Sequence, residues 1–172
     1  MSVTINGSGQ IVAQVVSTLF TTVISQAGSG GTWYSMSGFS ANITPSNSAN
    51  KVLVMVTIGR VACASGTTSV SFRINRSGTP VGVGVPTGSS SGNNAGNFLL
   101  TAWGSDSQQG GGGSFAFLDS PSSTSALTYS IDWQPQNSFT YYLNRTGNNV
   151  SSTDSFGNYT SSTITLLEIT GA

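Results

Sequence analysis

The sequence predicts an all-β domain, because its apolar residues recur at every second position and no stretch has the spacing of an amphipathic helix. The alternation is clearest in residues 70–76 and 127–133. Alternate side chains of a strand point to opposite faces, so one face of each segment packs on a core. Segments rich in glycine, serine and asparagine separate the candidate strands. Many short strands joined in this way are typical of a β-sandwich or a β-barrel.

The N-terminal part of the chain supplies the first strands. The candidates are residues 10–17, 19–24 and 37–43. A helix is the alternative for residues 10–24, since Ile11, Val15 and Leu19 are four residues apart. The valine and threonine content of this segment favours strand.

The stretch Val52–Ile58 is almost entirely apolar and β-branched, which predicts a central strand covered on both faces. Gly110–Gly113 lacks the Gly-Lys-Ser/Thr ending of a phosphate-binding loop, and we interpret it as a flexible connection. The remaining candidate strands are residues 70–76, 81–85, 98–103, 114–119, 127–133, 139–145 and 162–169.

Charge is scarce in this chain of 172 residues. Five residues are basic, five are acidic and none is histidine, so 6% are charged, against about a quarter in an ordinary domain. A nucleic-acid interface needs a stripe of Lys and Arg, and Lys51 is the only lysine. We therefore expect no nucleic-acid partner.

Several charged residues lie in or at the ends of candidate strands: Arg73, Arg76, Arg145, Asp119, Asp132 and Glu168. A buried charge without a partner costs several kcal/mol. We expect these residues to pair with one another, or to point to solvent or to a subunit interface.

The acidic residues do not form a recognisable catalytic or metal-binding motif. They are Asp106, Asp119, Asp132, Asp154 and Glu168. Asp119 precedes a Ser-Pro turn that it is expected to cap, and Asp132 falls on the polar face of its strand. Histidine is absent and Cys63 is the lone cysteine, which excludes a zinc site within one chain. We expect no catalytic residue, cofactor or metal, and hence no enzyme.

Cys63 is interpreted as a small buried apolar residue. Asn-x-Ser/Thr sequons begin at Asn6, Asn42, Asn75, Asn144, Asn149 and Asn158, and we attribute them to the composition of the chain. The first residues lack the pattern of a secretory signal, and no stretch of 18 apolar residues occurs, so we expect synthesis in a cytoplasm and no membrane segment.

Aromatic residues flanked by hydroxyl and amide side chains are candidates for a shallow sugar site. They are Trp33, Tyr34, Trp103, Tyr141, Tyr142 and Tyr159. The alternative is that they pack in the core or at a subunit interface. Tyr141 and Tyr142 must point to opposite faces of a strand, so at most one of them is in the core.

Five blocks of the sequence carry a family resemblance. They are residues 43–54, 72–76, 117–129, 142–148 and 162–169. In this order, over about residues 37–169, the chain resembles tailed-bacteriophage virion proteins, most familiar as C-terminal domains of fibre-like proteins in cyanophages and related marine phages. The resemblance implies a jelly-roll-like antiparallel β-sandwich that forms a homotrimer on the particle surface, and it implies no catalytic residue.

From this resemblance we expect residues 1–36 to form an N-terminal arm and first strands that dock on the capsid or tail, and residues 37–172 to form the jelly-roll-like domain. Since no shaft repeat precedes the matched region, the expected function is a capsid cement or decoration protein, a trimeric knob bound to the major capsid protein. Its segment 1–24 would contact the capsid by strand addition. The alternative is a short tail fibre or receptor-binding protein that contacts tail proteins and host surface glycans.

Overall fold

The computed structural model describes residues 11–84, 96–103, 110–147 and 158–170, which form β-strands and no helix. The all-β prediction is confirmed. The strands are β1 (Val12–Phe20), β2 (Ile24–Ala27), β3 (Tyr34–Ile43), β4 (Lys51–Cys63), β5 (Thr67–Arg76), β6 (Thr79–Val81), β7 (Phe98–Trp103), β8 (Gly111–Asp119), β9 (Leu127–Pro135), β10 (Thr140–Leu143) and β11 (Ser162–Ile169).

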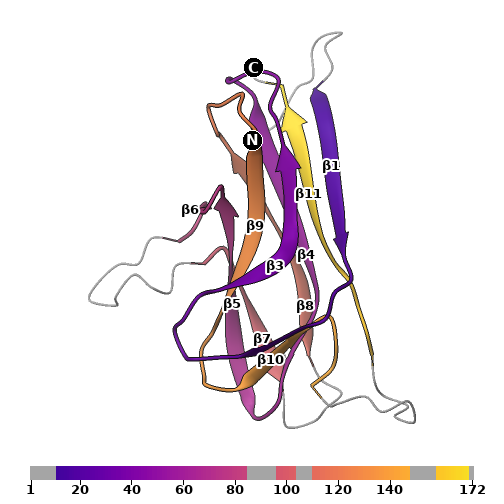
Figure 1. Cartoon of the computed structure of the whole chain (residues 1–172), viewed down its shortest axis with the longest axis vertical. Helices are drawn as coiled ribbons and strands as arrows, with labels where there is room; N and C mark the ends of the chain where they lie inside the picture. The colour runs from indigo at the N-terminus through magenta and orange to yellow at the C-terminus, as the bar shows by residue number, and fades with distance from the viewer. Residues whose placement is uncertain (1–10, 85–95, 104–109, 148–157, 171–172) are drawn as a thin grey trace, which may run out of the picture.

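The long strands form two antiparallel sheets that run along the longest axis of the molecule (Figure 1). One sheet has the order β1-β11-β4-β8, and the other has the order β3-β9-β5-β7. The chain alternates between the two sheets except at β5 and β7, which are neighbours in one sheet. This connectivity is that of an eight-stranded jelly roll made of two Greek keys.

Three short strands extend the sandwich. β6 pairs with β5, and β10 pairs with both β2 and the end of β4. At that same end β4 meets β7 in a parallel bridge between Ala62 and Trp103, so the two sheets are continuous and curl into a half-barrel.

The core lies between the sheets and is built by alternation. In β11, for example, Ile164 and Leu166 are fully buried, whereas Thr165 between them is only partly buried. The largest buried side chains are Trp133, Tyr129, Tyr141, Phe39, Phe72 and Met36. Burying each large apolar side chain contributes about 1.5–3 kcal/mol, so this core is the main source of stability.

The N-terminal segment is strand, and the helical alternative for residues 10–24 is wrong. β1 pairs with β11 from Val12 opposite Ile169 to Phe20 opposite Ser162, and Phe20 enters the core. β1 and the first residues of β3 belong to the jelly roll, which therefore begins before residue 37. The start of β1 and the end of β11 lie together, far from β10 (Figure 1).

The glycine run is a strand and not the flexible connection that we expected. Residues Gly111–Gly113 open β8 and pair with β4. A Cβ at Gly112 would overlap the carbonyl oxygen of Gly59, and one at Gly113 would lie 2.6 Å from the ring of Phe98. Glycine is present here because the neighbouring strand and ring occupy the space of a side chain.

The expected strand at residues 19–24 is wrong, because β1 continues to Phe20, residues 21–23 are in no strand and β2 begins at Ile24. Two later strands also differ from their expected ranges. β6 covers residues 79–81 where 81–85 was expected, and residue 85 lies outside the described part of the chain. β10 ends at Leu143 because Asn144 adopts a positive φ of 62°. A left-handed residue interrupts the alternation of a strand.

Candidate functional site

The outer face of the β1-β11-β4-β8 sheet carries an apolar row. Strand register aligns Val15 with Leu167, Leu167 with Leu53, and Leu53 with Leu118. Directly opposed residues of antiparallel strands project from the same face, so these side chains form one row across four strands. Val15 is 59% exposed and Leu118 is 48% exposed.

Two more rows continue this outer face. They are Ser17-Thr165-Met55-Ala116 and Leu19-Thr163-Thr57-Ser114. Their hydroxyls pair across strands, Ser17 with Thr165 at 2.8 Å and Thr57 with Ser114 at 3.0 Å. No residue of the three rows is charged. The outer face therefore exposes apolar side chains and has few polar groups that depend on water.

The prediction that Val52–Ile58 is covered on both faces is wrong for the single chain. Val52, Val54, Val56 and Ile58 are buried in the core, but Met55 on the outer face is 46% exposed. Exposed apolar surface of this kind is typical of interaction sites.

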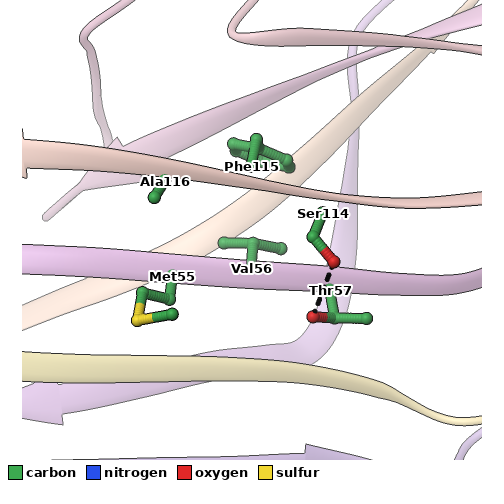
Figure 2. Close-up of a pocket in the computed structure, with 6 residues that line it drawn as sticks. All are labelled: Met55, Val56, Thr57, Ser114, Phe115 and Ala116. Atoms are coloured by element: carbon green, nitrogen blue, oxygen red, sulfur yellow. Dashed lines mark hydrogen bonds between the residues drawn. The ribbon is translucent and has the colours of Figure 1, made fainter.

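The outer face also has a shallow hollow between β4 and β8. Figure 2 shows its lining residues, Met55, Val56, Thr57, Ser114, Phe115 and Ala116, with the Thr57–Ser114 hydrogen bond between the two strands. Its volume of about 280 Å³ is at the lower limit for small-molecule sites. We regard it as a shallow depression of the outer face and not as a ligand site.

Asp119 forms a buried ion pair and does not cap a turn as expected. Both of its carboxylate oxygens accept from Arg76, at 2.9 and 2.8 Å, and the Tyr129 hydroxyl donates to it at 2.7 Å. Burial raises the pKa of the Tyr129 phenol, and the neighbouring Asp119 raises it further. The cluster is structural, because every charged group in it is satisfied.

Asp132 forms the second ion pair and is buried by the residues around it. It accepts from Arg73 Nε at 3.1 Å and from Nη2 at 2.8 Å, and the guanidinium lies 4.3 Å from the ring centroid of Trp33. The pairing expected for Arg73 and Arg76 is thus confirmed.

Glu168 is buried with amide and hydroxyl partners, whereas we had expected an arginine partner, solvent or a subunit interface. Ser46 donates its backbone N–H at 2.6 Å and its hydroxyl at 2.7 Å, and Asn50 Nδ2 donates at 2.6 Å. Burial raises the pKa of Glu168, but the hydrogen bonds from Asn50 and Ser46 outweigh it and hold the pKa below its usual value. Glu168 thereby ties the loop after β3 to the end of β11.

Arg145 has no carboxylate partner among the described residues. Its guanidinium lies 3.9 Å from the ring centroid of Tyr142. Arg145 also pairs with Tyr159 in an isolated antiparallel bridge. The structure thus brings Tyr142 and Tyr159, two of the predicted sugar-site residues, to the same arginine.

The other aromatic candidates lie elsewhere. Tyr141 is in the core, opposite in direction to Tyr142 as predicted, and Tyr34 packs against the core. Trp33 belongs to the Arg73 cluster, and the side chain of Trp103 lies outside the described part of the structure.

Sequence reasoning did not find the roles of Asn144 and Arg145. Asn144 is fully buried, and its side chain donates to the carbonyls of Phe20 and Thr22 and accepts from Ser162. The available signal was an asparagine directly after a predicted strand, since asparagine is enriched at positive φ.

Cys63 is buried as predicted, and burial raises the pKa of its thiol. The sequon residues Asn75 and Asn144 are also buried, whereas Asn42 and Asn158 are exposed, and Asn6 and Asn149 lie outside the described residues. Within the described ranges, no group of three or more Cys, Asp or Glu residues is arranged to hold a metal ion, and no helix is long and apolar enough to cross a membrane.

No protein-family model and no curated protein sequence matches the chain.

Proposed function

We propose that this protein is a structural component of a bacteriophage particle, a homotrimeric decoration protein that binds the major capsid protein on the head. The sequence blocks that resemble phage virion proteins support a place on a phage particle, and the jelly-roll fold is compatible with that place. The observation that carries the assembly is the set of three uncharged rows on the outer face of the β1-β11-β4-β8 sheet, next to which Lys51 lies opposite Ile169 at the end of β4.

A second copy of the chain is the partner proposed for this outer face. The apolar row Val15-Leu167-Leu53-Leu118 gains burial in an interface, at about 25 cal/mol per Å². The paired hydroxyls beside it lose little when water is excluded, because their hydrogen bonds are already made. With no charge in the rows, identical copies meet without electrostatic repulsion.

The attachment to the capsid is proposed for the N-terminal edge of the jelly roll. β1 is the last strand in the sheet order, so its second edge pairs with no described strand. Such an edge accepts an added strand. Many copies on a shell then reinforce modest contacts by avidity.

The oligomer is tested by the mass of the full-length protein in solution, with a matched pair of variants. The wild-type chain of 17.6 kDa should run as a trimer, and Leu118→Glu should run as a monomer. Leu99→Glu is the control, because Leu99 is 55% exposed on a strand of the other sheet and should leave the trimer intact. A monomeric wild-type protein, or a trimeric Leu118→Glu variant, would contradict the proposed interface.

The location is tested on particles. Electron microscopy should place hundreds of copies on the head, and particles without the protein should release DNA at a lower temperature. The capsid contact proposed for β1 should survive deletion of residues 1–10, because that deletion leaves β1 in place. Loss of head binding in this variant would move the contact to residues 1–10. A deletion of residues 1–24 would also remove Phe20 from the core. Stable heads that fail to adsorb to cells would instead support the tail-fibre alternative.

A further inference from the structure

Arg145 differs from Arg73, the other arginine that lies over an aromatic ring in the described part of the chain. Arg73 lies over Trp33 and also gives two hydrogen bonds to Asp132. Arg145 lies over Tyr142 in the same way, but the described carboxylates are all bound to other groups. Its Nε is buried without a hydrogen-bond partner. The guanidinium is thus held in place without an acidic partner from the described residues.

The backbone builds this arrangement. Tyr142 and Arg145 are three residues apart, so a regular strand would place them on opposite faces. Asn144 adopts a φ of 62° between them and returns Arg145 to the side of Tyr142. The buried Asn144 side chain fixes this turn through the carbonyls of Phe20 and Thr22.

Tyr159 completes the cluster on its exposed side. It is directly opposite Arg145 in an antiparallel bridge, so the two side chains project to the same side of the backbone. Tyr159 is 63% exposed. An open aromatic ring therefore lies next to a guanidinium whose position is fixed by stacking.

From this geometry we propose that Tyr142, Arg145 and Tyr159 bind a sugar that carries a carboxylate, as in a uronic acid residue of a polysaccharide. The two terminal nitrogens of Arg145 donate to the carboxylate in a bidentate pair, since Nε is buried. The apolar C–H face of the sugar ring packs on Tyr159. A single guanidinium matches the single charge of a carboxylate, whereas a nucleic acid requires several cations.

The site does not depend on the proposed assembly, and it is tested by calorimetry on the full-length protein. The probes are trigalacturonic acid and its fully methyl-esterified form, in which an uncharged methyl ester replaces each carboxylate. We expect trigalacturonic acid to bind and the ester to bind at least about tenfold more weakly, because the charge-assisted hydrogen bonds are lost.

Three variants assign the residues. Arg145→Gln should weaken binding by about tenfold or more, and Arg145→Lys should recover only part of it, because lysine lacks the planar fork. Tyr159→Ala should weaken binding by about three- to tenfold through loss of the stacking surface. Leu118→Glu is the control. It should bind trigalacturonic acid as the wild type does while its oligomer mass in solution falls, which separates this site from the trimer interface. Thermal unfolding verifies that each variant is folded.

The proposal fails if trigalacturonic acid shows no binding at millimolar concentration, or if the methyl ester binds equally well. It also fails if acetate or inorganic phosphate binds as tightly as the sugar acid, because the site would then be a simple anion site. Unchanged binding by folded Arg145→Gln would overturn the assignment of the residue.

Discussion

Asn144 shows how a single side chain positions a functional cluster. It combines a positive φ with a fully satisfied, buried amide. Its backbone N–H also donates to the carbonyl of Arg60 at 2.8 Å. The residue therefore connects β10, the end of β4 and the segment after β1.

Asn144→Ala should destabilise the protein by about 3 kcal/mol, because alanine leaves buried partners unsatisfied and tolerates positive φ poorly. Asn144→Gly should lose less, since glycine adopts the conformation without strain. Urea unfolding measures both variants. Asn137→Ala, at an exposed position, is the control and should change stability by less than about 0.5 kcal/mol. Equal effects of Asn144→Ala and Asn137→Ala would refute this role.

Glu168 determines part of the pH dependence of stability in acid. Its pKa is lower in the folded than in the unfolded chain, so the stability that it supplies is complete above its ordinary pKa of 4.5 and is lost as the pH falls through the folded value. Glu168→Gln should cost about 1–2 kcal/mol at pH 7 and make the loss of stability below pH 4.5 shallower. Unfolding curves across this pH range check it. A variant with an unchanged loss of stability in acid would show that other carboxylates determine it.

At the scale of elements, β8 depends on its glycines. Gly112→Ala should destabilise the protein by about 1–3 kcal/mol, because the added methyl group overlaps the backbone of Gly59 in β4. Gly84→Ala is the matched control, since its nearest neighbour would be 3.8 Å away. Thermal unfolding compares the two. A Gly112→Ala variant as stable as Gly84→Ala would indicate that β4 and β8 separate easily.

The same strand shows what a sequence predicts and what it does not. Strands such as β5, β9 and β11 were predictable because apolar alternation is a local signal. The glycine strand was not, because its cause is a neighbouring strand about 50 residues earlier in the chain. The partners of Glu168 likewise come from a loop 118 to 122 residues away. The Tyr142–Arg145–Tyr159 cluster was only partly predictable, since the aromatics were candidates but the turn at Asn144 was not.

At the scale of the whole molecule, composition left sandwich and barrel open, and the resemblance to phage proteins pointed to the jelly roll. The prediction that Val52–Ile58 is covered on both faces was wrong for the single chain. An uninterrupted apolar strand predicts cover on both faces, but only one cover is part of the same chain.

The absence of histidine predicts a flat pH response near neutrality. Between about pH 5.5 and 7.5 no side chain titrates at its ordinary pKa, and burial raises that of Cys63. The melting temperature should therefore be nearly constant over this range, apart from a small effect of the N-terminal amine. A steep change between pH 6 and 7 would reveal a strongly perturbed group.

The pairing of Val12 with Ile169 makes the chain suitable for circular permutation. The backbone N–H of Thr170 donates to the carbonyl of Ile11 at 2.8 Å, so a short peptide can close the chain into a ring there. New ends opened in the exposed Thr124–Ala126 segment would leave every strand pairing intact. Such a circular permutant should keep the melting temperature of the wild type. It would also carry any fused cargo on the loop between β8 and β9, at a distance from Tyr142 and Arg145.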